Sequence, residues 1–235
     1  MKSIKTLLAT LAVVACAASA MAIQNQVVWV SDSSGGISLT PATSTSGVVT
    51  YTGSDTFWSV VVSTGTAYPP AVGQGTLSAP VMDLSIIATS TGAAGSSGHT
   101  LSITFGADGF GPTSGGFMAL MSGHLVSGTA NPVVFSTDYA TTPTSLAGPP
   151  ASPPAGTQLT TSGSLAGPTY SSLVDSGIVT LGSPYILEEV VTIGAATAGS
   201  YSLDGSLTTV PDGGTTAMLL GAALSVLGLI RRKLA

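Results

Sequence analysis

The chain has 235 residues, of which five are basic and ten acidic, so its formal net charge is −5. All five basic residues lie within the first five or the last five positions, and the one cysteine is Cys16, so the long central segment has no lysine, arginine or thiol. A segment whose only charges are negative repels phosphate backbones, which argues against nucleic-acid binding. The same composition removes arginine clamps for phosphoryl transfer, Schiff-base lysines, thiol nucleophiles and thiolate metal sites.

Residues 1–22 have the three parts of a secretory signal peptide. A short basic region comes first, an apolar stretch follows from Leu7 to Ala15, and small residues come next. Ala20 and Ala22 provide the small residues of the predicted cleavage site, and cleavage after Ala22 is preferred. We therefore expect export through the Sec translocon.

Cys16 leaves a second interpretation of this terminus. It ends the sequence Val-Val-Ala-Cys, a loose match to a lipoprotein cleavage box. We prefer the signal peptide, because two small-residue cleavage sites lie just downstream and the apolar run before Cys16 is short. In that interpretation Cys16 is discarded with the signal.

Residues 23–209 are expected to form an extracellular domain of β-strands. Short apolar runs alternate with polar residues between glycine, proline, serine and aspartate, as when Leu101, Ile103 and Phe105 alternate with hydroxyl residues. About ten closely spaced strands predict an all-β fold, an antiparallel two-sheet sandwich that is jelly-roll-like. The candidate strands are 26–31, 47–52, 56–63, 82–89, 101–105, 116–127, 132–136, 173–181, 185–193 and 201–207.

The expected core consists of apolar residues on the inner strand faces. These candidates are Trp29, Tyr51, Trp58, Val60, Leu84, Ile86, Leu101, Ile103, Phe105, Phe117, Leu120, Val134, Ile178, Leu187, Val191, Ile193 and Leu203. Residues 141–157 depart from the strand pattern, because they contain five prolines. Proline cannot donate to a β ladder, so we expect a semi-rigid surface loop inside one sandwich. A linker between two lobes is the alternative.

Acidic residues suggest few sites. Asp32 and Asp108 lie in glycine-rich stretches that could hold a structural calcium ion, but calcium takes about six to eight oxygens and neither stretch has a second acid. We therefore interpret both as ordinary turn residues and predict no metal or cofactor site. Glu188 and Glu189 are adjacent in a probable strand, so they point to opposite faces, and we expect solvated or hydrogen-bonded side chains.

We predict no catalytic residues, because the chain has no Gly-x-Gly-x-x-Gly, Walker-type, His-Glu-x-x-His or Gly-x-Ser-x-Gly motif. His99 and His124 could each join a serine and an aspartate, but we interpret both as surface residues. A carboxylate pair across a sugar-binding cleft is the remaining enzymatic alternative, although the sequence does not select the pair. The aromatic residues that could stack on sugars, which we expect mainly in the core or at its rim, are Trp29, Trp58, Tyr51, Tyr68 and Tyr170.

The last 26 residues have three successive parts. A short motif comes first, made of Val210, Pro211, Asp212, Gly213 and Gly214. The uncharged apolar segment 215–230 would then form a helix of about 24 Å, just short of the hydrocarbon core of a bilayer. The final part, 231–235, begins with Arg231, Arg232 and Lys233. Cations at that end alone orient a transmembrane helix with its tail in the cytoplasm and the domain outside.

This three-part arrangement resembles the PEP-CTERM type of exosortase sorting signal. It is most similar to the VPDSG-CTERM variant, with Gly213 where that variant has serine. The resemblance implies that an exosortase, an integral-membrane cysteine transpeptidase, cuts near Val210, Pro211 and Asp212 and releases or transfers the domain. It also implies a Gram-negative bacterium that makes exopolysaccharide. An ordinary single-pass anchor that is never cut is the alternative.

We therefore expect an exported protein that is anchored in the inner membrane before processing and then reaches the cell surface or the extracellular matrix. Its expected partners are the Sec translocon, an exosortase, the membrane and exopolysaccharide. The leading hypothesis is a non-enzymatic structural or adhesive β domain in a biofilm matrix. A secreted carbohydrate-binding or glycoside-hydrolysing domain is the alternative, and a lipoprotein anchored at Cys16 is the second alternative.

Overall fold

The computed structural model describes residues 25–33, 42–44, 48–68, 79–92, 94, 98–143, 145–182, 184–194 and 197–211. The predicted signal peptide with Cys16, Ala20 and Ala22, and the predicted transmembrane segment 215–230, lie outside these ranges. Within them, no helix combines the length and the apolar character needed to cross a bilayer.

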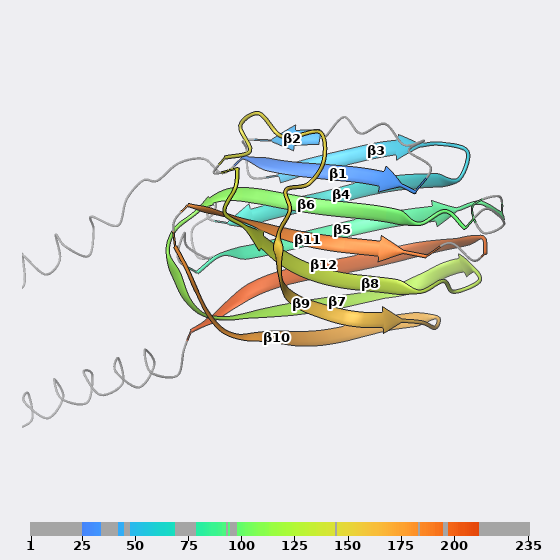
Figure 1. Cartoon of the computed structure of the whole chain (residues 1–235). Helices are drawn as coiled ribbons and strands as arrows, with labels where there is room; N and C mark the ends of the chain where they lie inside the picture. Colours follow the sequence, from blue (N-terminus) through green and yellow to red (C-terminus); the bar gives the residue numbers. More distant parts are fainter. Residues whose placement is uncertain are drawn as a thin grey trace, which may run out of the picture.

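Two antiparallel sheets of six strands form the domain (Figure 1). Sheet A has the strand order β2 (Ala42–Ser44), β1 (Gln26–Asp32), β6 (Leu101–Phe110), β11 (Tyr185–Ile193), β8 (Val133–Ala140) and β9 (Thr157–Leu165). Sheet B has the order β10 (Thr169–Leu181), β7 (Thr113–Gly128), β12 (Gly199–Pro211), β5 (Val81–Ser90), β4 (Trp58–Tyr68) and β3 (Val48–Ser54). The predicted all-β, two-sheet architecture is confirmed, and a jelly-roll-like sandwich fits it.

The core lies between the sheets and follows the period-two alternation of the strands. In β5, every second residue from Met82 to Ala88 is buried, while the residues between them face outward. Aromatic side chains fill much of the remaining volume. Those that are buried in this core are Trp58, Phe105, Phe110, Phe117, Phe135, Tyr170, Tyr185 and Tyr201.

Two of the predicted core residues face solvent instead, and a third, Val134, is only half-buried because Val133 and Phe135 are the inward residues of β8. Leu120 is 43 % exposed and Ile178 is 74 % exposed. In β7, apolar residues occupy both faces, and the inward set proves to be Phe117, Ala119 and Met121. The irregularity in β10 between Asp175 and Ile178 reverses which alternate residues point inward, so Ile178 turns outward.

The proline-rich segment 141–156 crosses the outer face of sheet A, where it appears in yellow in Figure 1. The indole nitrogen of Trp29 donates a hydrogen bond to the carbonyl of Pro150 at 2.9 Å. Leu146 packs on Trp29 and Ile186 in a small second core outside the main one. Trp29 is therefore buried as predicted, but on the outer side of its sheet.

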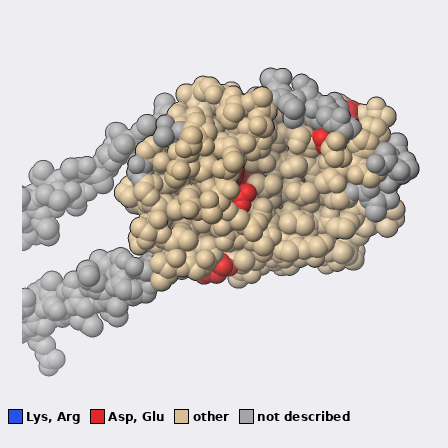
Figure 2. Space-filling view, in the orientation of Figure 1, with Lys and Arg blue, Asp and Glu red and all other residues tan. Residues whose placement is uncertain are grey.

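The first and last strands bring both ends of the domain to one end of the sandwich. Strand β1 begins and β12 ends at the left in Figure 1. Figure 2, in the same orientation, shows a surface without lysine or arginine and with few acidic groups. A polypeptide that continues from β12 into a membrane would therefore hold this end of the sandwich nearest the bilayer.

Candidate functional site

The outer face of sheet B is left uncovered by the described residues, whereas the proline-rich segment covers sheet A. The large apolar side chains that are exposed among the described residues all belong to sheet B: Val48, Ile87, Met118, Leu120, Val126, Leu173 and Ile178. Between them lie hydroxyl side chains, including Thr52, Ser59, Ser85, Thr89, Ser122, Ser202, Ser206 and Thr208. We call the outward-facing side chains of sheet B the open face.

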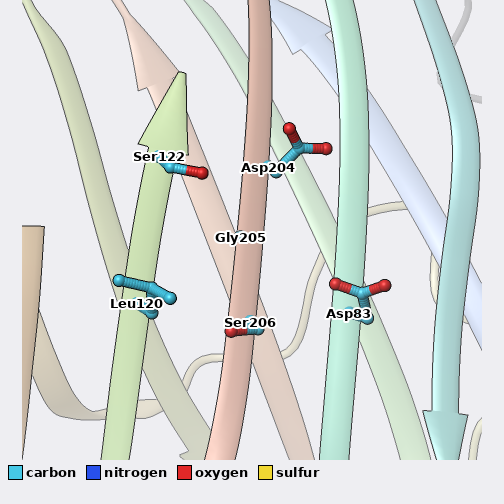
Figure 3. Close-up of a pocket in the computed structure, with 6 residues that line it drawn as sticks. All are labelled: Asp83, Leu120, Ser122, Asp204, Gly205 and Ser206. Carbon is cyan, nitrogen blue, oxygen red and sulfur yellow. The ribbon is translucent and has the colours of Figure 1, made fainter. Parts of the chain in front are cut away.

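A pocket of about 190 Å³ lies near the middle of the open face. Its lining comes from three neighbouring strands, β7, β12 and β5 (Figure 3). Asp83 pairs with Ser206 in register, and Asp204 pairs with Ser122 on the other side of β12. Asp83 and Asp204 are thus diagonal neighbours, a relation that places Cα atoms roughly 7–8 Å apart. The complete lining is Asp83, Leu120, Ser122, Asp204, Gly205 and Ser206.

The glycine in the pocket floor is required by packing in the core below. A Cβ atom on Gly205 would lie 2.9 Å from Cε2 of Phe135, which projects from sheet A. The aromatic ring therefore occupies the space that a side chain at 205 would need. Hydroxyl and carboxylate groups surround this bare backbone position on the outer side.

Electrostatics in the pocket are set by two acids without a nearby cation among the described residues. Partial burial raises the pKa of Asp83, and the negative charge of Asp204 raises it further. The pocket therefore disfavours anions and offers acceptors to hydroxyl groups or cations. Sugar hydroxyls have the matching chemistry.

Neither acid of the pocket was singled out by the sequence. The alternation in 82–89 and 201–207 places Asp83 and Asp204 on the polar faces of their strands. This is the only feature of the sequence that indicates that the two acids are outward-facing. The two acids are brought together by the pairing of β5 with β12. Register partners in these two strands are at least 109 residues apart in the sequence. Local periodicity does not indicate which strands pair across such a separation.

Glu188 and Glu189 point to opposite faces of β11 as predicted, but neither side chain is solvated, and for Glu189 the expectation of a hydrogen-bonded side chain is wrong as well. Glu188 is 2 % exposed and Glu189 is fully buried. Within the described residues, Oε1 of Glu188 and both carboxyl oxygens of Glu189 have no hydrogen-bond partner. Leu187 and Val191, on the same face of β11 as Glu189, belong to the main core, and Ile186, on the face of Glu188, packs in the small second core, so both faces of β11 are covered.

Burial dominates the protonation of both glutamates. It raises the pKa of Glu188 to about 8, with a further contribution from the charge of Asp138 opposite on β8. Burial also raises the pKa of Glu189 well above its ordinary value, and the charge of Asp83 adds to the effect. Burial therefore favours the protonated form of both side chains, and this form suits neither a carboxylate nucleophile nor a metal ligand.

The two candidate calcium-binding aspartates have other contacts. Asp108 accepts hydrogen bonds from the backbone and side-chain nitrogens of Asn25 at 2.8 and 2.9 Å, and from the backbone nitrogen of Leu146. It lies within β6 rather than in a turn, and it fixes the start of β1 and the proline-rich segment. Among the described residues no group of three or more His, Cys, Asp or Glu side chains is arranged to hold a metal ion.

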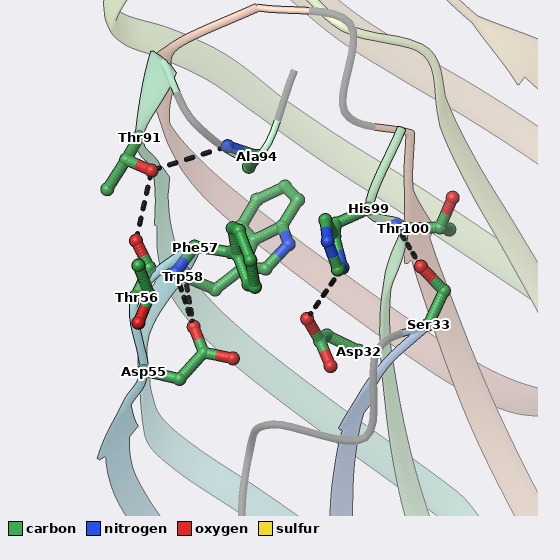
Figure 4. Close-up of polar contacts among 10 residues, drawn as sticks. All are labelled: Asp32, Ser33, Asp55, Thr56, Phe57, Trp58, Thr91, Ala94, His99 and Thr100. Carbon is green, nitrogen blue, oxygen red and sulfur yellow. Dashed lines mark hydrogen bonds and ion pairs between the residues drawn. The ribbon is translucent and has the colours of Figure 1, made fainter. Parts of the chain in front are cut away.

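Asp32 instead contacts His99 at one end of the sandwich (Figure 4). Nδ1 of His99 lies 3.2 Å from Oδ2 of Asp32, and its ring stacks on Phe57 with centroids 3.7 Å apart. The His99 side chain is 13 % exposed, so its prediction as a surface residue is wrong. His124 is exposed on the open face, as predicted. Within the described residues neither histidine is hydrogen-bonded to a serine hydroxyl, so neither is arranged as a catalytic triad.

The aromatic residues considered for sugar stacking do not form a platform on the open face. Trp29, Trp58 and Tyr170 are 3 % exposed or less. Tyr51 is half-buried and packs against the main core. The side chain of Tyr68 lies outside the described part of the structure. A ligand of the open face would therefore meet hydroxyl, carboxylate and aliphatic groups.

The C-terminal motif begins inside the folded domain. Val210 and Pro211 are the last residues of β12 and pair with Gly116 and Gly115 of β7. The expected domain boundary at 209 thus falls within a strand. The remaining residues of the predicted sorting signal are outside the described residues: Asp212, Gly213, Gly214, Arg231, Arg232 and Lys233.

Comparisons with solved structures give only distant similarity. A tailspike protein of bacteriophage CBA120 is 10 % identical with a TM-score of 0.31, and the match covers 66 % of this chain and 20 % of that one. A xylan-binding CBM22-1 domain from Paenibacillus barcinonensis is 12 % identical with a TM-score of 0.27, covering 67 % and 88 %. A family 11 carbohydrate-binding module from Clostridium thermocellum is 10 % identical with a TM-score of 0.26, covering 66 % and 90 %. Similarities this low carry no conclusion about ligand or reaction.

The family comparison is specific to the C-terminus. No curated protein matches the chain. The family model of the VPDSG-CTERM motif matches residues 209–234, and the central domain has no family match. Residues 209–234 are therefore a VPDSG-CTERM motif, a sorting signal of the PEP-CTERM-like kind.

Proposed function

We propose that this chain is an exported protein, processed by an exosortase and displayed at the cell surface or in the exopolysaccharide matrix as a non-enzymatic structural or adhesive module. The VPDSG-CTERM motif at 209–234 carries this proposal. The mature domain would lie outside the cell, with its sorting end toward the inner membrane until processing. The open face, with hydroxyl, carboxylate and aliphatic groups, is the surface through which we propose that it contacts matrix components.

Sorting is tested by expressing the full chain with and without a VPDSG-type exosortase. We expect the mature C-terminus to lie near Pro211 and Asp212 only when the exosortase is present, as determined by mass spectrometry of the recovered protein. Replacing Asp212 with Ala should abolish this product, because it changes the motif and leaves the apolar segment and the basic tail intact.

A control variant and two other results distinguish exosortase processing from the alternative anchors. Asp175→Asn, on the edge strand β10, should be processed like the wild type. An intact Arg231, Arg232 and Lys233 tail in both strains would reject processing and support a permanent anchor. Incorporation of labelled palmitate, lost on replacing Cys16 with Ser, would instead support the lipoprotein alternative.

A carbohydrate-binding function is the second candidate, and the Asp83–Asp204 pocket favours it. The two acids and the hydroxyls of Ser122 and Ser206 could accept and donate hydrogen bonds to a neutral saccharide, while Leu120 offers an aliphatic contact. Anionic polysaccharides would meet repulsion from the acids. This assignment makes neutral glycans the first ligands to screen.

Asparagine substitution measures whether the pocket binds sugar. We expect a neutral glycan that binds the wild type on a glycan array to bind Asp83→Asn or Asp204→Asn about tenfold more weakly, because a charge-assisted hydrogen bond contributes roughly 1.5–3 kcal/mol. Asp175→Asn, at the edge of the same face, is the matched control. Equal binding by all variants would place the glycan elsewhere, and turnover in a hydrolysis screen that one substitution abolishes would refute the non-enzymatic proposal.

A further inference from the structure

The sorting motif and the folded domain share three residues. The motif covers 209–234, whereas β12 continues to Pro211. Thr209, Val210 and Pro211 are in register with the segment 115–117 of β7. A peptidase that binds an extended peptide uses the same backbone groups that a β ladder uses. In the folded domain these groups face β7 and are unavailable to a second partner on that side.

These three residues are held less firmly than the rest of β12. From Gly199 to Thr208 the strand lies between β7 and β5, but the register with β5 ends at Thr208. Beyond that point β7 is the one strand in register with β12 among the described residues. On the β5 side, the backbone nitrogen of Thr209 still donates a 3.3 Å hydrogen bond to the carbonyl of Pro80, so Val210 and Pro211 are the residues paired on one side alone. Pro211 has no N–H to donate. A strand end paired on one side opens at a lower free energy than a central strand.

The partner surface on β7 weakens this end further. Val210 and Pro211 lie opposite Gly116 and Gly115, which have no side chains to pack across the ladder. The next strand, β10, is irregular at the same level, with Gly177 at a φ of 70°. Cross-strand side-chain contacts supply much of the stability of a sheet. Val210 and Pro211 therefore have no register partner on β7 that can supply such a contact, whereas Thr209 lies opposite Phe117.

The connection to the membrane is short. Three residues separate Pro211 from the apolar segment that begins at Thr215, and these span about 10 Å when extended. Releasing 209–211 from the ladder would lengthen the connection to about 20 Å. The added length would move the motif away from the body of the sandwich.

We propose that residues 209–211 form a detachable strand end, which must leave β7 before the sorting peptidase can bind the motif. The β domain then controls its own processing, because the folded ladder competes with the peptidase for the same backbone. Residues 199–208 stay paired on both sides, so the released domain keeps its two sheets. The inference rests on the proposed processing by an exosortase.

An insertion tests this competition without changing the motif. Six Gly/Ser residues between Thr208 and Thr209 would leave β12 intact to Thr208 and keep 209–211 out of register with β7. With a VPDSG-type exosortase, we expect this full-length variant to be processed roughly tenfold faster than the wild type in a pulse-chase experiment, since two or three ladder bonds no longer compete. The same insertion after Gly148, in the segment over sheet A, is the matched control and should leave the rate unchanged.

A cross-link tests the opposite change. Val210→Cys with Gly116→Cys joins register partners, whose Cα separation suits a disulfide, in a mature domain that otherwise has no cysteine. We expect the oxidised protein to keep its tail and the reduced protein to be processed. Equal processing rates in the wild type and the Thr208–Thr209 insertion variant would overturn the detachable end while leaving the sorting function intact. If neither protein is cut, the proposed function fails and this inference fails with it.

Discussion

The folded domain is expected to lose stability as the pH rises from about 5 to about 8. Glu188 has a pKa near 8 in the folded state, against 4.5 as the ordinary value, and the pKa of Glu189 is also raised. Below pH 4.5 both the folded and the unfolded chain hold these protons. Above it the unfolded chain releases them while the folded chain retains them, so the free energy of unfolding falls with rising pH.

The size of the effect follows from the shift. Between the pKa of the unfolded chain and the raised pKa of the folded chain, the free energy of unfolding falls by roughly 1.4 kcal/mol per pH unit. Glu188 alone should therefore lower the free energy of unfolding by about 3 kcal/mol at pH 7. Glu189 acts in the same direction. Asp83 and Asp138, whose pKa values are raised mainly by burial, add smaller contributions of the same sign.

Denaturant unfolding at several pH values from 4.5 to 8.5 checks this prediction. Glu188→Gln should flatten the pH dependence, because the amide keeps the shape of the side chain and does not titrate. Glu189→Met should do the same and remove two carboxyl oxygens that lack partners among the described residues. Asp175→Asn is the control, since it removes a carboxylate from an exposed strand and keeps the acceptor for the backbone nitrogen of Gly177. Stability that is constant or rises over this range would contradict the assignment.

Local alternation is enough to predict the fold class. It does not show which face of a wholly apolar strand points inward, or where the pairing of two strands becomes irregular. Leu101, Ile103 and Phe105 are buried as their spacing predicts. In β7, by contrast, Phe117 and Leu120 have opposite orientations, and an apolar run has no polar residues to mark the inner face. Ile178 follows an irregularity in pairing with β7, which depends on how two strands meet and is absent from the pattern of either one.

The candidate sites likewise differ in whether local sequence is enough to predict them or strand pairing must be known. The sorting motif is a contiguous segment, so its residues could be recognised from the sequence alone. The pocket joins Asp83 to Asp204 through the pairing of β5 with β12, which local sequence does not specify. Burial of both Glu188 and Glu189 also depends on strand order, because β11 lies between β6 and β8 with the proline-rich segment crossing its sheet.

Removing the side-chain amide of Asn131 is expected to destabilise the domain by about 3 kcal/mol, because several buried groups would lose their partners at once. Asn131 is fully buried where β7 crosses to β8. Its side chain donates to the carbonyl of Thr197 at 2.8 Å and accepts from the backbone nitrogen of Thr197 at 3.0 Å. It also donates to the hydroxyl of Tyr201, which in turn donates to the carbonyl of Thr129 at 3.1 Å.

This network joins the two connections that pass between the sheets at that end, β7 to β8 and β11 to β12. A mature domain without cysteine has no disulfide to hold such crossings, so buried hydrogen bonds and packing must fix them. Asn131→Ala should lower the denaturant midpoint sharply, and Tyr201→Phe should cost about 1–2 kcal/mol because it removes the hydroxyl and keeps the buried ring. Since each change breaks the shared bond, the double variant should lose less than the sum of the two. Strict additivity would show that the two residues act independently. Thr89→Ala, on the exposed side of β5, is the control. If Asn131→Ala lowered the free energy of unfolding no more than Thr89→Ala does, the crossings would be held by apolar packing alone.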